Sequence, residues 1–547
     1  TVIRGDVYSG NGGEINITLN GTNSILEGQV DDYHELANED MENKVFHNSA
    51  FTDDEGNELD VTSAGKATLN INDGGKWIAR GQSFVDTVTL DGGIIDMSKN
   101  ENSSVTVENL TGEGGKFIMR LDTGDHTNSD MLYVTGTFEG THELEIAGDE
   151  FVASEITENN PLRFATIKGD VNVENMKARV TDAGFFNNTY NITKEKFDKN
   201  HAENEAYNGS GNGQGSYKPG NDVVTSTFDG SDVNLLITAE GKQSQISDAG
   251  QTIINMSRAN YSNAIYMDRL NKRMGEARYI SPEDEQGMWV RLRHDRIGKE
   301  DAFRSQNTMY EMGYDVKQDC DNGDRRVGFD IDYMDGKTEY RNVAGDGDIK
   351  RYGLWLYDTW MGDKGHYADY VLKWGHLEND FDIYNSRGKV NGDYSNNVFS
   401  VSAEYGKKND IGNDWYFEPQ AQLQLARVTG ADYVTSQNTK VSLDGINSLI
   451  GRAGFRLGKD MGERSTVYVK ADVLHEFLGD QTISALDTTT NGTYRETFEN
   501  KGTWYDVGFG FATALGKDSY AFMDFEKSFG NDNDETYQIN AGVQWTF

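Results

Sequence analysis

The stretch that decides the fold is the last one, Tyr537-Gln-Ile-Asn-Ala-Gly-Val-Gln-Trp-Thr-Phe547. Its odd-numbered residues are apolar or aromatic, and its even-numbered residues are polar or glycine. This period of two is typical of a β-strand with one apolar face. A strand of a soluble β-sandwich alternates in the same way, so this stretch alone does not separate a sandwich from a membrane barrel.

The same alternation recurs throughout the C-terminal half. Residues 327–333, 399–405 and 415–425 each place apolar side chains on one face and polar or charged side chains on the other. We count twelve such strands, which begin near residues 288, 307, 325, 350, 366, 396, 414, 447, 465, 502, 518 and 536. Most are long enough to cross a bilayer when tilted. An even number of strands is what a bacterial outer-membrane barrel has.

The connections between these strands indicate which end of the barrel is which. Outer-membrane barrels have short periplasmic turns and longer outer loops. The short connections here are 319–324, 362–365, 407–413, 460–463 and 516–517. The long ones are 335–349, 378–395, 427–446 and 479–501. The first strand therefore begins, and the last one ends, on the predicted periplasmic side.

A chain that reaches the first strand from outside the cell must cross the membrane. Residues 247–277 change period, and Asp248 is placed to cap a helix with Gln251 three residues on. Residues 248–274 would span about 40 Å as a helix. The segment is polar on most sides, so we expect it inside the barrel lumen, because exposed backbone does not cross lipid.

The inward faces of the predicted strands carry charges of both signs. A solvated lumen is the simpler interpretation of these charges. The sharper alternative is that some of them form ion pairs with Arg258, Asp268, Arg269, Lys272 and Arg273 of the helical segment. The predicted lumen charges include Arg293, Asp330, Lys373, Glu404, Glu418, Arg452, Lys470, Asp506 and Asp524.

The N-terminal half has a different repeat. Glycine pairs at 12–13, 74–75, 92–93 and 114–115 each precede a short alternating run, and the last three pairs are 18 and 22 residues apart. A repeat near 20 residues is typical of one coil of a β-solenoid, with an ordinary β-sandwich as the alternative. We interpret 107–150 as the closing segment of the solenoid and 193–232 as a loop. Because the pattern is already running at Thr1, we expect further coils upstream.

Composition limits the possible classes of protein. At the usual share of proline a chain of 547 residues would contain about 27, yet this one has 4, together with 61 Gly. Scarce proline with 11% aromatic residues favours extensive sheet over disorder. The net charge is −39, of which residues 1–250 carry −26 from 43 acidic and 17 basic side chains. This acidity argues against nucleic acid as a partner, and a single cysteine excludes a disulfide framework.

Taken together, these features resemble autotransporters, the type V secretion proteins of Gram-negative bacteria. Arg269-Leu-Asn-Lys-Arg-Met-Gly275, followed by Met288-Trp-Val-Arg-Leu292, is similar to the junction between helix and first strand in the serine-protease members. Its residues of interest are Leu270, Asn271, Lys272, Arg273, Met274, Gly275, Trp289 and Arg291. Ser129-Asp-Met-Leu-Tyr-Val134 lies in a region similar to the autochaperone end of a pertactin-like passenger. The alternate residues before the C-terminus resemble the outer-membrane insertion signal, namely Tyr537, Ile539, Val543, Trp545 and Phe547.

The resemblance implies an all-β fold in three parts. Residues 1–240 would form a right-handed parallel β-solenoid, with an autochaperone-like segment at about 107–240. Residues 241–285 would be a linker with a lumen-spanning α-helix, and 286–547 a 12-stranded antiparallel transmembrane β-barrel. The implied role is to insert the barrel in the outer membrane and to translocate and display the N-terminal passenger at the cell surface.

The resemblance also implies the partners. These are outer-membrane lipid, the barrel-assembly machinery and periplasmic chaperones. The alternative function is that of an adhesin or self-association protein whose retained solenoid binds host or sister cells. We expect no cofactor, no metal and no enzymatic activity.

Two positions depart from the family pattern. Self-cleaving relatives carry Asn-Asn directly before Leu-Asn-Lys-Arg-Met-Gly, and an asparagine side chain attacks its own backbone carbonyl. Here Asp268 and Arg269 occupy these positions. A charged carboxylate is a poor substitute for the amide in that step, so we predict that the passenger stays attached.

Overall fold

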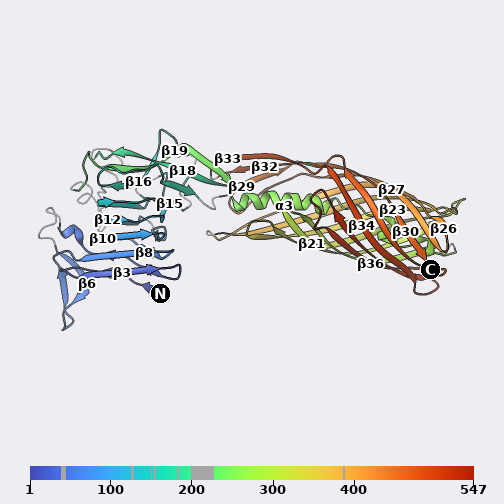
Figure 1. Ribbon diagram of the computed structural model, residues 1–547, viewed down its shortest axis with the longest axis horizontal. Helices are drawn as coiled ribbons and strands as arrows, with labels where there is room; N and C mark the ends of the chain where they lie inside the picture. The colour runs from blue at the N-terminus through green and yellow to red at the C-terminus, as the bar shows by residue number, and fades with distance from the viewer. Residues whose placement is uncertain are drawn as a thin grey trace. The chain divides into compact units, whose positions relative to one another are not determined.

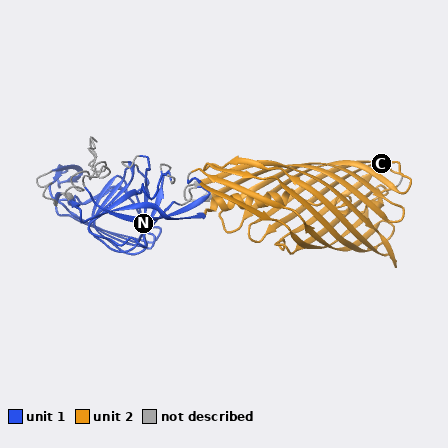
Figure 2. Cartoon of the chain, turned by 90° about the horizontal axis from the view of Figure 1, so that it is seen from above, with its two compact units in different colours: residues 1–245, 489–491 blue, residues 246–488, 492–547 orange. Residues whose placement is uncertain are grey.

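The computed structural model describes residues 1–547 except 38–44, 101, 125–127, 149–150, 153–154, 181–183, 199–226, 282, 386–387 and 489. The central part of the loop predicted at 193–232 lies outside these residues. The chain divides into two compact units, residues 1–245 with 489–491 and residues 246–488 with 492–547 (Figure 2). The first contains the glycine-punctuated repeat, and the second contains the predicted membrane strands.

The first unit is a parallel β-solenoid, which confirms the interpretation of the glycine repeat (Figure 1). One face stacks, each strand parallel to the next, β3 (Glu14–Asn20), β8 (Lys66–Asn72), β10 (Gln82–Asp91), β12 (Ser104–Thr111), β14 (Met131–Phe138) and β16 (Leu162–Ile167). A second face stacks β4 (Ile25–Glu27), β9 (Lys76–Ile78), β11 (Ile94–Asp96), β13 (Gly115–Arg120), β15 (His142–Ala147) and β17 (Lys177–Val180). Three short strands, β1 (Val2–Arg4), β2 (Val7–Tyr8) and β5 (Val30–Asp31), complete the first coils. Strands β6 (Phe46–Thr52) and β7 (Glu58–Val61) form a separate hairpin.

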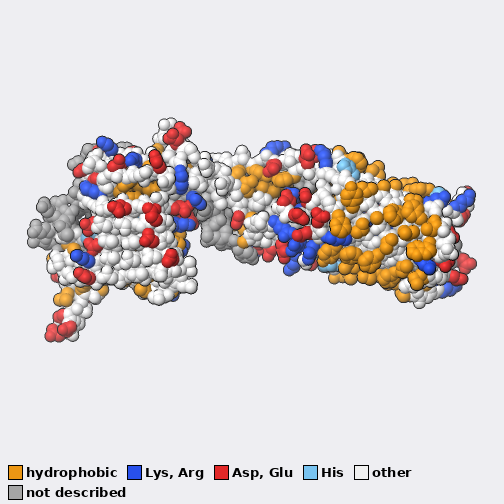
Figure 3. All heavy atoms as spheres, viewed as in Figure 1, with side chains coloured by type: hydrophobic (Ala, Val, Ile, Leu, Met, Phe, Trp, Pro, Cys, Tyr) orange, Lys and Arg blue, Asp and Glu red, His pale blue; other side chains and the backbone are white. Residues whose placement is uncertain are grey.

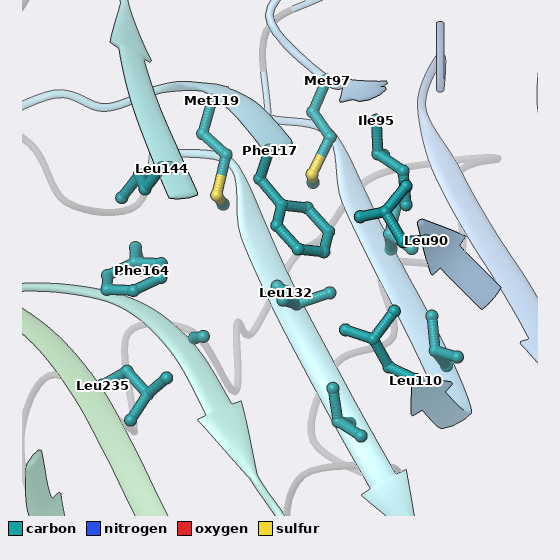
Figure 4. Packing of buried hydrophobic residues seen from close by; sticks show 14 of the residues in the cluster. Leu90, Ile95, Met97, Leu110, Phe117, Met119, Leu132, Leu144, Phe164 and Leu235 are labelled. Atoms are coloured by element: carbon teal, nitrogen blue, oxygen red, sulfur yellow. The ribbon is translucent and has the colours of Figure 1, made fainter. Parts of the chain in front are cut away.

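The solenoid core is a column of apolar side chains stacked coil upon coil. Trp77, Ile95, Phe117 and Leu144 occupy equivalent positions on four successive strands and are all buried. Figure 4 shows Ile95, Phe117 and Leu144 among the neighbouring buried side chains. Because each coil contributes the same apolar position, burial repeats along the whole stack.

The glycine pairs have a steric explanation. Gly92 has φ of +62°, a left-handed conformation that favours glycine. A Cβ on its neighbour Gly93 would collide with the carbonyl of Ile71 in the preceding coil. The pair therefore provides the turn and then the close approach between coils.

The solenoid closes later than the sequence indicated. Strands within 107–150 still pair in parallel with the next coil, so the assignment of that stretch as the closing segment is wrong. Antiparallel pairing begins with β18 (Phe186–Lys196) on β17 and β19 (Val233–Ile246) on β16. These two strands cover the last parallel edges, which would otherwise expose unpaired backbone groups.

The buried His142 predicts a pH dependence of the solenoid. Burial lowers the pKa of its ring, against the smaller opposing effects of the Glu139 backbone and the Glu113 and Asp91 carboxylates. A histidine with a depressed pKa favours the folded state above its ordinary value of about 6.5, and this stabilisation is lost as the pH falls. We expect faster hydrogen exchange of β13 and β15 at pH 5 than at pH 7.5, after correction for intrinsic rates.

The control separates His142 from the other titrating groups. Burial raises the pKa of Asp31 to about 7, which favours folding at lower pH and acts in the opposite sense. We therefore compare the full chain with His142→Leu, which should remove the acid-induced loosening. Replacement of the exposed His47 by Leu should leave the loosening in place. An unchanged pH response in His142→Leu would contradict the assignment.

The second unit contains twelve long antiparallel strands that close into a barrel, as counted over the described residues. They are β20 (Gln286–Lys299), β21 (Phe303–Gln318), β22 (Asp324–Tyr340), β23 (Gly345–Met361), β24 (His366–Asn385), β25 (Gly388–Lys407), β27 (Trp415–Val428), β30 (Ile446–Asp460), β31 (Ser465–Glu476), β34 (Gly502–Ala514), β35 (Ser519–Phe529) and β36 (Tyr537–Thr546). Pairing of β36 with β20 closes the ring, and the short β26 (Asn409–Gly412) pairs with the start of β27. The predicted strand number is confirmed.

No helix in the described ranges has the combination of length and apolarity needed to span a membrane.

A band of apolar side chains covers the outside of the barrel. Tyr310, Leu372 and Phe509 are 58%, 56% and 61% exposed. Figure 3 shows this band as a continuous apolar surface on the viewed face, bordered on one side by charged side chains. Such a band matches the lipid-facing belt of an outer-membrane barrel.

Two of the expected outer loops, 335–349 and 378–395, are mostly strand, and that part of the prediction is wrong. Strand β22 extends to Tyr340, and β24 and β25 leave only 386–387 between them. The alternation inverts there, because Ile349, Phe381 and Ile383 are buried inside while Asp380 faces out. Beyond the apolar band the exterior faces water, so the polar side chains change sides.

The other two long connections also contain strands. Residues 427–446 contain β28 (Ala431–Val434) and β29 (Thr439–Leu443), and 479–501 contain β32 (Asp480–Asp487) and β33 (Gly492–Glu499). Together they form a four-stranded sheet. The turns at the opposite end are short, and Cys320 is exposed in one of them.

Candidate functional site

A helix lies inside the barrel. Helix α3 (Asp248–Ala264) begins after Ser247, whose hydroxyl accepts a hydrogen bond from the Gly250 backbone at 3.0 Å. The residue expected to cap the helix was Asp248, so the cap is one residue earlier. The helix is also shorter than the expected 248–274, because residues 265–269 leave the helical path before α4 (Leu270–Met274).

Polar side chains hold α3 from several sides of the lumen. Asn260 donates to Asn379 of β24 at 2.9 Å and to Asn396 of β25 at 3.0 Å. Tyr261 donates to Glu476 of β31 at 3.1 Å, and Asn263 to Ser305 of β21 at 3.2 Å. These partners come from opposite parts of the barrel sequence, which fits a polar helix enclosed by a polar wall.

Tyr266 anchors the bend between the two helices. The Arg293 guanidinium lies 3.7 Å from the centre of its ring, and the Lys373 ammonium lies 5.3 Å from it. The Arg351 guanidinium is 6.0 Å away. Cations over an aromatic face are attracted to it, and more strongly when water is excluded. The sequence did not single out Tyr266, because only the fold brings the three cations to its ring.

Asp268 is held by two arginines. Its carboxylate accepts from Arg291 of β20 at 2.8 Å and from Arg273 of α4 at 3.3 Å. Arg273 also donates to Asp369 of β24 at 2.7 Å. All four side chains are buried. Asp268, at the position that matches the family cleavage site, is therefore neutralised by Arg273 and Arg291.

Arg269 lies at the centre of a group of carboxylates. Its guanidinium is 2.7 Å from Asp472, 2.9 Å from Asp506 and 2.9 Å from Glu526. On the same side Lys272 forms an ion pair with Glu526 and donates a hydrogen bond to Gln538, both at 2.7 Å. The positions of these partners on β31, β34, β35 and β36 tie the segment to the far wall of the barrel.

The first residue of α4 is hydrogen-bonded to the barrel wall, and the helix ends in a tight turn. The Leu270 backbone donates to Glu404 at 3.0 Å, and the Met274 carbonyl accepts from Tyr520 at 2.6 Å. Asn271 accepts from Gln420 at 3.1 Å. Gly275 has φ of +61°, and a Cβ there would also collide with the Phe522 ring.

An aromatic layer lies beside α4. The buried side chains of Leu270 and Met274 pack in one cluster with Trp289, which donates to Tyr357 at 2.9 Å. Other members of this cluster are Trp355, Tyr367, Ala512, Tyr520 and Phe522. A cavity of about 180 Å³ remains beside Tyr266, Arg269 and Lys272. The helices and this layer therefore fill most of the lumen cross-section around α4.

The nine lumen charges singled out from the sequence are all buried within the barrel: Arg293, Asp330, Lys373, Glu404, Glu418, Arg452, Lys470, Asp506 and Asp524. Arg452 connects Glu404 at 3.0 Å with Asp472 at 2.7 Å, and Lys470 pairs with Asp524. Asp330 is fully buried and has no hydrogen bond to its carboxylate among the described residues. The simpler expectation, a freely solvated lumen, does not describe this set of ion pairs.

Glu276 and Arg278, which were not predicted from the sequence, join Glu418 and Arg456 in a second charged group. Glu276 lies 3.1 Å from Arg456 and 2.9 Å from Arg278, and Glu418 contacts both arginines at 2.9 Å. Glu276 directly follows Gly275 of the junction motif, and this position was the one signal in the sequence that could have indicated its role.

The C-terminal residues occupy the outer face of β36. Tyr537, Ile539, Val543 and Trp545 alternate with buried polar residues, and Phe547 is 58% exposed. The Phe547 backbone exchanges hydrogen bonds with Gln286 at 3.0 and 3.1 Å. These residues therefore lie at the seam where the last strand meets the first.

Comparisons with known proteins agree with this geometry. The model of the autotransporter beta-domain family matches residues 286–526. The pertactin autotransporter of Bordetella parapertussis is 30% identical over 317 residues, which cover 55% of this chain and 33% of that protein. The serine protease pet autotransporter of Escherichia coli is 25% identical over 496 residues, or 88% of this chain and 35% of that protein. This chain thus spans about a third of the length of these relatives.

Among solved structures, the beta domain of the Bordetella autotransporter BrkA is 25% identical, covers 48% of this chain and 100% of that chain, and has a TM-score of 0.40. The match to the family model covers most of the closed barrel, and the match to the pet autotransporter, over 88% of this chain, extends into the solenoid. The C-terminal barrel, over residues 286–526, is an autotransporter beta-domain, and the chain is similar in sequence to autotransporters of Gram-negative bacteria.

Proposed function

We propose that this barrel translocates and displays its own N-terminal solenoid. In this proposal residues 1–240 are the passenger, with an autochaperone-like segment at about 107–240. Residues 241–285 are the linker, and 286–547 are the translocator. The supporting observation is the path of the chain, which enters the lumen as α3, continues through α4 and reaches the short-turn end where β20 begins.

A foreign cargo tests the transport role. Residues 240–547 with an epitope in place of the passenger should expose the epitope on intact cells. Exposure is measured by antibody labelling and by loss of the label after external protease. An epitope that stays in the periplasm, although the barrel resists SDS at room temperature, would refute the proposal. A periplasmic epitope fusion without the barrel serves as the control for leaky cells.

The outer face of β36 is the proposed insertion signal. Tyr537, Ile539, Val543, Trp545 and Phe547 present alternate apolar side chains on a strand that needs β20 to complete its pairing. This exposed edge before closure suits recognition by the barrel-assembly machinery, after delivery by periplasmic chaperones. Outer-membrane lipid surrounds the assembled barrel.

The role of the passenger is a second part of the proposal. An acidic, retained solenoid suits an adhesin or self-association module, and cell aggregation that requires residues 1–240 would support that role. The relatives include a serine protease, but we propose no enzyme activity for this chain. His294 and His475 each contact a threonine on a neighbouring strand, and their positions alternate with lumen residues on the outward face of the barrel.

The passenger is predicted to remain covalently attached. Asp268 lacks the amide nitrogen that attacks the backbone in self-cleaving relatives, and its carboxylate is committed to Arg273 and Arg291. Outer membranes should therefore yield the full-length chain on denaturing gels. A separate barrel band of about half the 61.0 kDa chain would contradict the prediction.

Two variants give this prediction its control. Asp268→Asn restores the amide beside the same peptide bond and should produce a cleaved fraction. Asp268→Ala removes the carboxylate without supplying a nucleophile and should stay intact. Cleavage of both variants would point to an external protease.

A further inference from the structure

The outside of the barrel carries an apolar groove with a basic edge. We propose that it binds the acylated, phosphorylated disaccharide lipid of the outer leaflet, the lipid A part of lipopolysaccharide. The acyl chains would lie in the groove, and the phosphates would lie on the basic edge.

The groove is formed by two rows of outward side chains that cross neighbouring strands. The row nearer the short turns consists of Ala521, Val543, Val290, Met312 and Ile331. The other row runs from Met523 through Ala541 and Leu292 to Tyr310, each directly opposite the next. It continues to Tyr333 and Tyr352. The groove has a volume of about 1070 Å³, and the small side chains of Ala521 and Ala541 are part of its lining. An apolar hollow on a membrane-facing surface is complementary to hydrocarbon chains.

The basic edge lies on the same strands, towards the end opposite the short turns. Four residues along each strand from the row that starts at Met523, a further row places Lys527 beside Tyr537, then Arg296, Gln306 and Lys337. Lys350 lies one row closer to the groove. Two residues along a strand are about 7 Å, so flexible lysine side chains reach the boundary of the apolar band. Figure 3 shows blue side chains at this border, together with red ones.

The charges at this edge favour an anionic head group. Lys337, Lys350, Arg296 and Lys527 form no side-chain ion pair within the described part of the chain. Asp348 and Asp335 lie opposite the first two, and Glu378 and Asp380 continue the two rows on β24. On β35, β36, β20 and β21, however, the two rows hold Arg296 and Lys527 and no carboxylate. The edge faces the outer leaflet, because the short turns mark the periplasmic side. Two phosphates joined to several acyl chains therefore match both the groove and its edge.

The test uses purified full-length protein in detergent, titrated with bis-phosphorylated lipid A and followed by native mass spectrometry. Replacing Arg296, Lys337, Lys350 and Lys527 together by Gln should lower the bound fraction by at least about tenfold, because each cation near a lipid surface contributes substantially. The matched control removes four cations at the short-turn end, Lys364, Lys407, Lys459 and Lys517, and should bind normally.

A second pair of variants tests the groove without changing charge. Ala541→Phe fills the groove floor and should weaken binding, whereas Ala453→Phe, on the outward face of β30, should not. The unmodified protein should prefer lipid A over its dephosphorylated form and over phosphatidylglycerol. Equal binding of these lipids, equal loss in both four-cation variants, or unaltered binding by Ala541→Phe would each overturn the proposal.

Discussion

Replacing Arg269 by Met is expected to destabilise the assembled barrel by about 3–5 kcal/mol, the usual result of breaking a buried ion pair from one side. Asp472, Asp506 and Glu526 would remain buried around an uncharged side chain. Arg452 still pairs with Asp472, and Lys272 and Lys470 with Glu526. Asp506 has no such second cation among the ion pairs of the described residues. The loss is measured as a lower urea midpoint for the SDS-resistant folded form.

The same substitution elsewhere on the helical segment provides the control. Arg258 forms an ion pair with Asp301, whose side chain is 64% exposed, at 2.9 Å. The Arg258 side chain is only 15% exposed, but its exposed partner is screened by water. We expect such a pair to contribute about 0–1 kcal/mol, so Arg258→Met should scarcely move the midpoint. Arg269→Lys should lie between the wild type and Arg269→Met, because a lysine retains charge but cannot reach three carboxylates with a planar fork. Equal effects at 258 and 269 would show that the ion-pair centre does not hold the barrel together.

Much of the fold could be predicted because each part repeats a simple period. The pairs at Gly92 and Gly114 mark coils, and alternation at 399–405 or 537–547 marks membrane strands. The strands beyond the membrane were missed because their alternation has the opposite sense. Leu372 faces lipid, yet Phe381 on the same strand faces inward. The rule that apolar side chains face outward and polar side chains face inward therefore applies only to the part of each strand that lies in the lipid.

The candidate site was predictable only as a set of inward-facing residues. Alternation places Asp506 and Arg452 in the lumen, but the choice of partners depends on strand register and on the exit of the chain from α3. Arg269 meets Asp506 across 237 positions of sequence. The early end of α3 at Ala264 has the same cause, because Tyr266 gains cationic neighbours that no local propensity contains.

The ion pairs and the aromatic layer contribute differently to the way in which α3 and α4 fill the lumen. The aromatic cluster around Trp289 and Met274 excludes water, but apolar packing does not fix the orientation of the helical segment. The pairs of Asp268, Arg269 and Arg273 fix which side of the segment meets which wall. Buried ion pairs cost desolvation energy and contribute little net stability. Their value here lies in positioning the linker at one register in the lumen.

Truncation at Glu276 is expected to convert a closed barrel into a conducting channel. Residues 276–547 retain all twelve strands but lack α3 and α4, whereas 247–547 retain both helices. In planar bilayers the shorter chain should give steady single-channel openings, and the longer chain should stay closed, because a polar barrel interior without its plug fills with water. The open channel should be cation-selective. The lost segment carries Arg258, Arg269, Lys272 and Arg273 against Asp248 and Asp268. Its removal takes the ion-pair partner from Asp506 and from Asp369, which have no other among the described residues.

The measurement separates filling of the lumen from loss of charge. Arg269→Met in residues 247–547 removes one cation but leaves both helices in place, so it should lower stability without opening the channel. A conducting Arg269→Met barrel would mean that the ion pairs themselves close the pore. Equal conductance of the two truncations, or anion selectivity of 276–547, would mean that the helices do not close this lumen. Because both chains share every barrel strand, any difference in conductance must come from residues 247–275, which contain α3 and α4.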